Sequence, residues 1–245
     1  MIVIPLAGKS ERFKAVGIDQ PKWSLKVGSQ SILDRAIVSV LSSCDEGEQI
    51  VLGCLTGQLE TLSKALEAKT LEQVILVELE KPTKGQAESV LRIINKVNVD
   101  VSERLVIWCG DSAFKSDAFN FRSKKGSWIL VSALPGDHWS FVKEKSGEVI
   151  EVAEKLRISD HASLGLYSFG TAEDFLNTEP LEIRAGYTES FVAPLFNDLI
   201  TKSKQVGMFA IDSRDYFPLG TPKEIIETAH RMKWDLPEEL GRFKP

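Results

Sequence analysis

The sequence is poor in the residues that build metal centres and disulfide frameworks. Its 245 residues include only three cysteines and three histidines. Cys44, Cys54 and Cys109 form no Cys-x-x-Cys spacing, and the histidines lie far apart along the chain. This distribution argues against a zinc site or a disulfide scaffold. We interpret the cysteines as free thiols, buried in a protein from a reducing compartment.

Long apolar runs are missing as well. No uninterrupted stretch approaches the ~20 apolar residues that span a bilayer, and the start of the chain lacks the basic and apolar segments of a signal peptide. The formal net charge is −5, which argues against broad electrostatic capture of nucleic acid or of an anionic membrane. We therefore expect a cytoplasmic protein, not inserted in a membrane, that holds any phosphate with local basic groups.

The first half of the chain alternates between strand and helix patterns. The hydrophobic content of 43% and the charged content of 27% are ordinary for a globular protein, and the length suits one large domain. Strand patterns at 2–6, 50–55, 73–79 and 105–109 are separated by helical patterns that follow Ser31 and cover 59–68 and 86–97. Such alternation predicts βαβ units in a doubly wound parallel sheet.

The second half has a different pattern. Strand-like runs at 127–134, 139–143, 149–154 and 163–169 are joined by short links, which predicts an antiparallel portion beside the parallel strands. A helix at 190–204, a strand at 206–211 and a helix from Pro222, opened by the capping box Thr221-Pro222-Lys223-Glu224, return to alternation. We predict a single α/β domain with a mixed, mainly parallel sheet, its halves covering about 1–115 and about 116–233.

A basic loop follows the first strand. Residues 7–13 read Ala-Gly-Lys-Ser-Glu-Arg-Phe, and Pro21-Lys22 comes shortly after. Backbone N–H groups, the freedom of Gly8 and the charges of Arg12 and Lys22 predict a phosphate-binding loop. It is not a P-loop, because Val3 stands where that motif needs glycine, and it lacks the three glycines of the dinucleotide fingerprint. A surface turn with solvated charges is the alternative.

A carboxylate follows the fourth strand of the predicted parallel sheet. Residues 105–109 lead into Gly110-Asp111, and ligands of open parallel sheets gather beyond the carboxyl ends of the strands. Asp111 would share that edge with the basic loop, and a carboxylate there suits Mg²⁺. A helix cap or Asx turn is the alternative role. The neighbouring basic loop favours the metal.

An ordered set of motifs resembles the nucleotidyltransferase (nucleoside-diphosphate-sugar pyrophosphorylase) family. The loop and the Pro-Lys pair resemble the family pattern L-A-G-x-G-x-R-F followed by P-K. Further matches follow in the family's order, from residue 2 to about 228: Gly85-Gln86-Ala87, Gly110-Asp111, Glu154-Lys155, the strand at 163–169 and Leu219-Gly220-Thr221-Pro222. The resemblance implies a glycosyltransferase-A-like α/β fold and a Mg²⁺-dependent nucleotidyl transfer.

The resemblance also implies a role for each matching residue. Arg12 would neutralise the departing pyrophosphate, Lys22 the α-phosphate, and Asp111 would hold Mg²⁺. The nucleotide would be bound by Leu6, Ala7, Gly8, Lys81, Gly85, Gln86 and Ala87. The acceptor would be bound by Glu154, Lys155 and Gly165, with Lys155 near its phosphate.

The implied reaction is an in-line displacement at the α-phosphorus of a nucleoside triphosphate. The nucleophile would be a phosphate oxygen of a sugar 1-phosphate or a related phosphomonoester, and pyrophosphate would leave. Such chemistry depends on positioning and charge neutralisation, and a phosphate dianion needs no general base. The products would serve surface polysaccharide or glycoconjugate synthesis. Members of the family often self-associate, so a homo-oligomer is a further expectation.

Departures from the family pattern leave alternatives open. Ser10 replaces the second loop glycine, and Lys81 stands where many members recognise the base with Gln, so the base is not predicted. Pro218 replaces the late metal-binding Asp of D-x-G-T-P. The candidates to replace it are Asp212, Asp215 and Glu189. The alternative function is a non-catalytic nucleotide- or sugar-phosphate-binding protein of the same fold. A glycosyltransferase is disfavoured, because residues 111–113 supply no Asp-x-Asp motif.

Aromatic and charged residues of the second half are candidates for the acceptor pocket. Trp and Tyr rings could stack on a sugar, although ordinary sheet packing explains them equally well. The candidates are Trp139, Phe141, Glu154, Arg157 and Tyr187.

Overall fold

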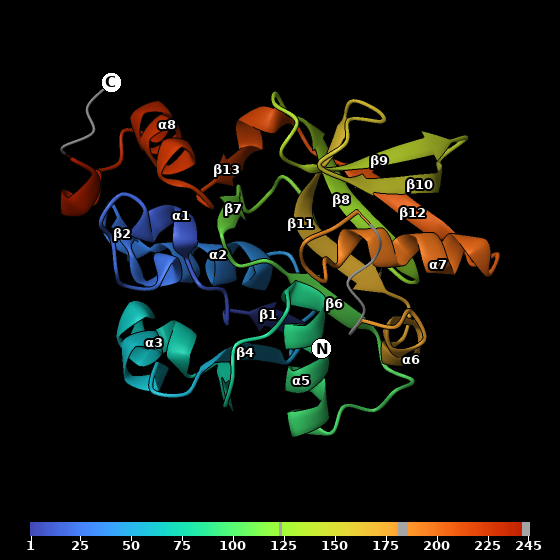
Figure 1. The fold of residues 1–245 in the computed structure, drawn as a ribbon, viewed down its shortest axis with the longest axis horizontal. Coiled ribbons are helices and arrows are strands. Elements are labelled where there is room, and N and C mark those ends of the chain that lie inside the picture. The colour runs from blue at the N-terminus through green and yellow to red at the C-terminus, as the bar shows by residue number, and fades with distance from the viewer. Residues whose placement is uncertain (123, 181–185, 242–245) are drawn as a thin grey trace.

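The computed structural model describes residues 1–122, 124–180 and 186–241. Its main sheet, within this described part, is built from nine strands: β1 (Ile2–Pro5), β4 (Ile50–Leu55), β5 (Val74–Leu79), β6 (Leu105–Trp108), β8 (Ser127–Ala133), β9 (Ser140–Lys145), β10 (Glu148–Glu154), β11 (His161–Phe169) and β12 (Val206–Ala210). The strand order is β5-β4-β1-β6-β11-β8-β12-β10-β9 (Figure 1). Both predicted halves therefore share one continuous sheet.

The first half of the sheet is parallel, as predicted. β5, β4, β1 and β6 pair in parallel, with Ile2 opposite both Ile50 and Val106. Every residue of β1 and β6 is buried, because helices cover both faces of a parallel sheet and favour continuous apolar strands.

The second half is mixed. β11 is antiparallel to β6 and β8, and β10 is antiparallel to β12 and β9. Ser146 and Gly147, with φ angles of 56° and 85°, form the turn between β9 and β10, since two successive positive φ angles match the twist of a tight hairpin. β12 pairs in parallel with β8. The prediction of a mixed α/β sheet is confirmed, but the sheet is not mainly parallel: among the described residues, four of its eight neighbouring strand pairs are parallel and four are antiparallel.

Helices pack on both faces of the sheet. The face that carries Ile2 and Ile4 packs against α2 (Ile32–Leu41) and α3 (Leu59–Ala65). The opposite face, which carries Val3, packs against α5 (Gln86–Val97), α6 (Ala172–Leu176) and α7 (Phe196–Thr201). The two faces alternate along β1 because successive strand side chains point to opposite sides. The remaining helices are α1 (Glu11–Lys14), α4 (Ala68–Leu71) and α8 (Pro222–Met232), and α8 lies at the opposite end of the molecule from α7 (Figure 1).

Several predicted bounds were wrong. The helix predicted at 190–204 is shorter: a 3₁₀ turn over Ala193–Leu195 precedes α7. Pro194 lacks an N–H donor and restricts the residue before it, which keeps an α-helix from extending back through this segment. The helix predicted at 59–68 divides into α3 and α4. The elements not predicted are too short to show periodicity: α1, α6, β2 (Lys26–Val27), β3 (Gln30–Ser31), β7 (Ser112–Phe114), β13 (Tyr216–Pro218) and the 3₁₀ turns Lys22–Ser24, Ser213–Asp215 and Glu238–Leu240.

None of the helices found among the described residues has the length and apolar character needed to cross a lipid bilayer.

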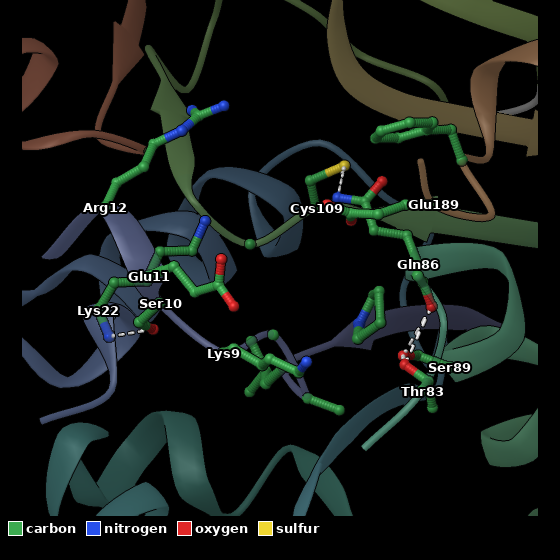
Figure 2. A pocket seen from close by; sticks show the side chains of 18 of the residues that line it. Lys9, Ser10, Glu11, Arg12, Lys22, Thr83, Gln86, Ser89, Cys109 and Glu189 are labelled. Carbon is green, nitrogen blue, oxygen red and sulfur yellow. Dashed lines mark hydrogen bonds between the residues drawn. The ribbon is translucent and has the colours of Figure 1, made fainter. Parts of the chain in front are cut away.

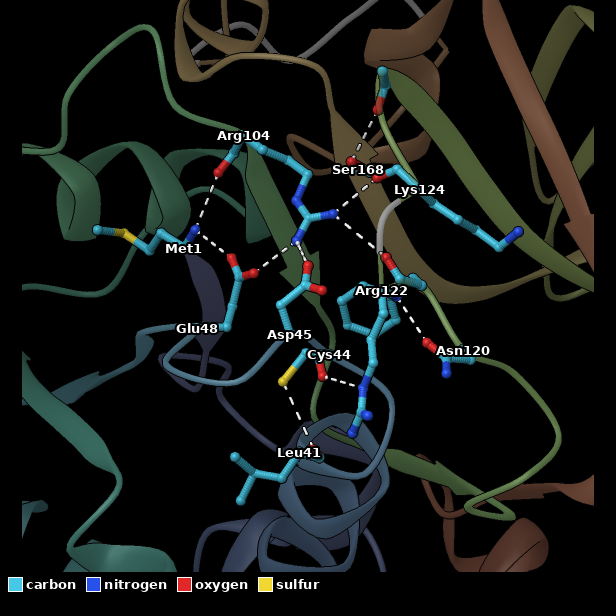
Figure 3. Close-up of polar contacts among 12 residues, drawn as sticks. Met1, Leu41, Cys44, Asp45, Glu48, Arg104, Asn120, Arg122, Lys124 and Ser168 are labelled. Atoms are coloured by element: carbon cyan, nitrogen blue, oxygen red, sulfur yellow. Dashed lines mark hydrogen bonds and ion pairs between the residues drawn. The ribbon is translucent and has the colours of Figure 1, made fainter.

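A polar network around Arg104 ties the start of β6 to two connecting segments (Figure 3). The Arg104 guanidinium lies 2.6 Å from the Glu48 carboxylate and donates to the carbonyl oxygen of Lys124 at 2.8 Å. Its side chain is 18% exposed and that of Glu48 is 10% exposed, so solvent screens this pair little. The amino group of Met1 lies 2.6 Å from the other Glu48 oxygen. The network therefore joins segments from four parts of the sequence.

Replacing Arg104 with Met should lower the free energy of unfolding by about 2–3 kcal/mol, because the remaining acceptors stay mostly buried without their donor. Urea unfolding at neutral pH measures the change. Arg214→Met is the matched control, since Arg214 pairs with Asp212 but is 86% exposed, and it should leave stability unchanged. An equally small effect at Arg104 would show that the network contributes little.

Candidate functional site

A cleft of about 740 Å³ opens beyond the carboxyl ends of β1 and β6. Figure 2 shows the loop after β1 and Lys22 on one side, with the start of α5, Cys109 and Glu189 on the other. The predicted site residues that line it are Leu6, Ala7, Gly8, Arg12, Lys22, Gly85, Gln86, Glu154 and Lys155. The sheet therefore brings both predicted halves of the site to one cleft, as expected for the open edge of a parallel sheet.

The loop after β1 is held in place at both ends. The Leu6 amide donates to the Gly53 carbonyl oxygen at 2.7 Å. Gly8 is exposed, with no atom within 4 Å of the position a Cβ would take. Ser10 has a φ of 53°, and its hydroxyl accepts a hydrogen bond from the Lys22 amide at 3.1 Å. Ser10 thus adopts a left-handed backbone conformation, which is uncommon for a residue other than glycine, and ties the loop to Lys22.

Lys22 and Asp111 meet at this edge, although 89 positions separate them. The Lys22 Nζ lies 2.6 Å from Asp111 Oδ2, and both side chains are about a quarter exposed, at 27% and 25%. Gly110 makes the turn after β6: its φ is 70°, and a Cβ there would lie 2.6 Å from Ile4. Glycine is required at this position, and the turn directs Asp111 to the cleft edge.

A short two-stranded sheet brings the segment just before α8 to Asp111. β13 is antiparallel to β7, with Pro218 opposite Ser112. The Leu219 amide donates to the Asp111 carbonyl oxygen at 3.0 Å. Proline is tolerated in β13 because this pairing lies outside the main sheet. Gly220 consequently stands next to the Asp111 side chain.

A second carboxylate borders the same space. A Cβ on Gly220 would lie 3.0 Å from Asp111 Oδ2 and 3.3 Å from Glu224 Oε2. Glu224 belongs to the first turn of α8, where its amide donates to the Thr221 hydroxyl at 3.2 Å. Its other carboxylate oxygen lies 3.1 Å from His138 Nε2. Asp111 and Glu224 therefore flank Gly220, and His138 holds one orientation of Glu224.

Glu224 was missed as a site residue because the sequence assigned it to a capping box. The helix start is confirmed, but the carboxylate faces His138 and Gly220. A Gly-Thr-Pro-x-Glu pattern, which places a carboxylate one helical turn beyond the Gly-Thr-Pro loop, is the signal that could have found it.

The three carboxylates predicted as replacements for the aspartate missing at Pro218 lie in different parts of the structure. Hydrogen bonds from Arg214 lower the pKa of Asp212 to about 2, and neither Asp212 nor Asp215 lines the cleft. Glu189 lines it on the side of Lys155. Among the described residues no group of three or more His, Cys, Asp or Glu side chains could hold a metal ion. A cation here would therefore need substrate oxygens to complete its coordination, as Mg²⁺ commonly does.

One end of the cleft predicted to bind the nucleotide is formed by the start of α5. The Gln86 side chain reaches the Cys109 thiol at 3.3 Å, and the Thr83 and Ser89 hydroxyls lie 2.6 Å apart. Burial, reinforced by the charge of Asp111, raises the pKa of Cys109, so the thiol stays neutral. Two of the residues predicted to bind the nucleotide do not line the cleft. Ala87 is fully buried, and Lys81 is exposed elsewhere on the surface. Contact of Lys81 with a bound base stays a prediction.

The end predicted to bind the acceptor combines two charged residues and an aromatic ring. The Lys155 amide donates to the Trp139 carbonyl oxygen at 2.9 Å, and its Nζ lies 4.7 Å from the centre of the Phe191 ring. Glu154 accepts a hydrogen bond from the Ser140 hydroxyl. Gly165 packs behind the cleft, where a Cβ would lie 2.9 Å from the Cys109 sulfur; its role is to let β11 approach Cys109 closely.

The aromatic residues predicted to line the acceptor pocket lie in three different environments. Phe141 is fully buried, with the Arg157 guanidinium 4.5 Å from its ring centre, and Tyr187 packs edge-on against Phe191 at 6.1 Å. Trp139 lines a neighbouring pocket of about 670 Å³ between α8 and the segment before β9. Sheet packing accounts for Phe141.

Glu154 should make stability depend on pH. Burial raises its pKa; the hydrogen bond from Ser140 and the charge of Lys155 oppose this effect, and the charge of Glu189 adds a smaller contribution to it. The folded protein thus binds this proton more tightly than the unfolded chain, so stability falls as pH rises from about 4.5, the ordinary value, through the raised pKa. The stability of Glu154→Gln relative to the wild type should therefore increase with pH across this window, as measured by urea unfolding. A difference that does not change with pH would contradict the burial of this charge.

No protein-family model and no curated protein matches the chain. Among solved structures, the nucleoside-diphosphate-sugar pyrophosphorylase from Vibrio cholerae RC9 is 28% identical with a TM-score of 0.82, over 94% of this chain and 100% of that one. The inositol-1-phosphate CTP transferase from T. maritima is 17% identical with a TM-score of 0.74, over 95% and 94%. A UDP-glucose pyrophosphorylase complexed with UDP-glucose is 13% identical with a TM-score of 0.73, over 95% and 97%.

These similarities confirm the resemblance predicted from the motifs. The chain has the mixed α/β fold of the solved nucleotidyltransferase structures along nearly its whole length, and its similarity to the pyrophosphorylase of 28% identity supports an enzyme of the nucleotidyltransferase type. The two structures below 25% identity support the fold alone.

Proposed function

We propose that the protein transfers a nucleotidyl group from a nucleoside triphosphate to a sugar 1-phosphate or a related phosphomonoester, releasing pyrophosphate. The observation that carries the proposal is the Lys22–Asp111 pair, 2.6 Å long, at the edge of a cleft lined by the basic loop, the start of α5 and Lys155. A cation and a carboxylate stand where the two reacting phosphates would meet. The pyrophosphorylase of 28% identity supports the reaction class.

The residues of the cleft supply positioning and charge. Arg12 is exposed at the mouth of the cleft, where it neutralises the departing pyrophosphate. Lys22 neutralises the α-phosphate, and Lys155 orients the acceptor phosphate across the cleft. The backbone of the loop after β1 and Gln86 hold the nucleotide. No side chain is needed as a general base, because the attacking phosphate is already ionised near neutral pH.

A donor set that suits Mg²⁺ lies at the edge of the cleft, beside Gly220. Asp111 and Glu224 present carboxylate oxygens to the space beside Gly220, and oxygen ligands are those that Mg²⁺ prefers. Glu224 thereby takes the place of the carboxylate missing at Pro218. When bound, Mg²⁺ would neutralise charge on the reacting phosphates.

Further parts of the proposal rest on the family resemblance. They are a glycosyltransferase-A-like arrangement, a place in making precursors of surface polysaccharide or glycoconjugates, and homo-oligomerisation. The proposal of a single domain and of a cytoplasmic location rests on the length and composition of the sequence. The proposal leaves the base and the acceptor to be identified by the panel of substrates described next.

The test is pyrophosphate release with Mg²⁺, using ATP, CTP, GTP, UTP and dTTP against a panel of sugar 1-phosphates, inositol 1-phosphate and phosphocholine. Release that depends on one acceptor supports the proposal and names both substrates. Triphosphate binding by calorimetry without release under any condition would support the non-catalytic alternative, and the absence of any binding would contradict both.

A further inference from the structure

Ser190 is seated against the turn that begins α5. The Ala87 amide donates to the Ser190 carbonyl oxygen at 3.0 Å, and the Ser190 amide donates to the Lys84 carbonyl oxygen at 3.1 Å. The Glu88 amide donates to the Ser190 hydroxyl at 3.3 Å. Ser190 is 2% exposed, so water competes little for these bonds. One residue from the second half of the chain thus makes three hydrogen bonds to the first.

These contacts replace a missing helix cap. The first N–H groups of a helix have no partner within it and are usually satisfied by the side chain of the N-cap residue. The N-cap of α5 is Gly85, which has no side chain. Ser190 satisfies the second and third amides of the helix from about a hundred positions away. A Cβ on Gly85 would lie 2.5 Å from the Ser190 carbonyl oxygen, so glycine permits this close approach.

Residues on both sides of this junction line the cleft. Gly85 and Gln86, on one side of the junction, are lining residues predicted to bind the nucleotide. Glu189 and Phe191, the two neighbours of Ser190, line the cleft near Lys155, whose Nζ lies over the Phe191 ring at 4.7 Å. A displacement of the turn before α5 would therefore also displace Glu189 and Phe191, near Lys155.

We propose that Ser190 is a positioning residue that couples the two substrate sites. A triphosphate bound at residues 85–86 fixes the start of α5, and through Ser190 it fixes Glu189 and Phe191 for the acceptor. Such coupling is reciprocal: each substrate raises the affinity for the other by the same factor. The inference rests on the proposed function for the assignment of the two ends, but the structural coupling can be measured with a triphosphate alone.

Hydrogen exchange with mass spectrometry tests the coupling. The probe is whichever of ATP, CTP, GTP, UTP and dTTP binds most tightly by calorimetry, at saturation and without acceptor. In the wild type, the triphosphate should slow exchange in the peptide covering 186–192 by roughly fivefold or more, because it suppresses local opening at the junction. Ser190→Ala removes only the hydroxyl, and it should reduce the protection to less than about twofold at saturating triphosphate.

Thr171→Ala is the matched control. The Thr171 hydroxyl caps α6 by accepting from the Asp174 amide at 3.0 Å, so the control loses a comparable cap outside the cleft and should keep the wild-type response. Ser190→Thr, which restores a hydroxyl, should recover protection. A purely structural cap would lower stability in both Ala variants without changing the response to triphosphate.

The outcomes separate the inference from the proposed function. Triphosphate binding without protection of 186–192 in the wild type, or equal protection in Ser190→Ala, would overturn the coupling and leave nucleotidyl transfer intact. Failure of every triphosphate to bind would overturn both. For the active enzyme, Ser190→Ala should raise the KM for the acceptor more than it lowers kcat.

Discussion

Replacing Asp111 with Asn is expected to lower the rate of pyrophosphate release by roughly 10³-fold, while the protein stays folded. The substitution keeps the size of the side chain and its backbone contacts, but it removes the charge that pairs with Lys22 at 2.6 Å. If the proposed function is right, that charge also holds the divalent cation that joins the reacting phosphates. The measurement is acceptor-dependent pyrophosphate release at saturating substrates, with near-UV circular dichroism to verify folding.

A matched control and a binding measurement define the cause of the loss. Asp117→Asn changes an aspartate that pairs with Lys115 but is 75% exposed, and it should leave the rate unchanged. Mn²⁺ binding, followed by electron paramagnetic resonance, should weaken roughly tenfold or more in both Asp111→Asn and Glu224→Gln, because each loses a charged oxygen ligand. Unchanged Mn²⁺ binding in Glu224→Gln would remove Glu224 from the site. A full rate in Asp111→Asn would contradict the role of Asp111.

Replacing Lys22 with Met should lower the rate by about 10²–10³-fold, with the larger part of the loss in kcat. A cation preorganised in a site with little water contributes most where negative charge develops in the transition state. Lys22 is 27% exposed and is fixed through its backbone by the Ser10 hydroxyl at 3.1 Å, so its ammonium is placed before the substrate arrives. Lys22→Arg should not restore the rate, because a planar guanidinium presents its charge differently.

Lys26→Met is the control for this change, since Lys26 is an exposed lysine in β2, four residues further along. The double variant Lys22→Met/Asp111→Asn adds a second check. Because the two side chains act together, its loss should be much smaller than the product of the single losses. A rate within tenfold of the wild type in Lys22→Met would exclude a direct role for this lysine.

The repeating elements of the fold could be predicted from local patterns. The bounds of β4 and α5 agree with the prediction, because a buried parallel strand and an amphipathic helix each repeat their signal over several residues. The loop after β1 and Asp111 could be placed at one edge because parallel strands share a direction. These inferences needed only periodicity and the geometry of an open sheet.

Long-range contacts could not be predicted in this way. β7 and β13 have three residues each and form only by pairing with one another, yet this pairing carries Gly220 to Asp111. Ser190 was assigned to a helix because the apolar residues after it suit one. In the structure its hydrogen bonds go to the start of α5 instead. Glu224 was assigned to a local cap, since its contact with His138, 86 positions away, has no local signal.

The most direct test of the central claim follows the α-phosphorus itself. The enzyme is incubated with Mg²⁺, the triphosphate labelled at the α-phosphate, and the acceptor found in the panel, and the products are separated. We predict that the label appears in a nucleotide joined to the acceptor through a diphosphate, in equal amount to the pyrophosphate released. Label found only in free nucleoside monophosphate, or retained in the triphosphate with every acceptor, would contradict nucleotidyl transfer.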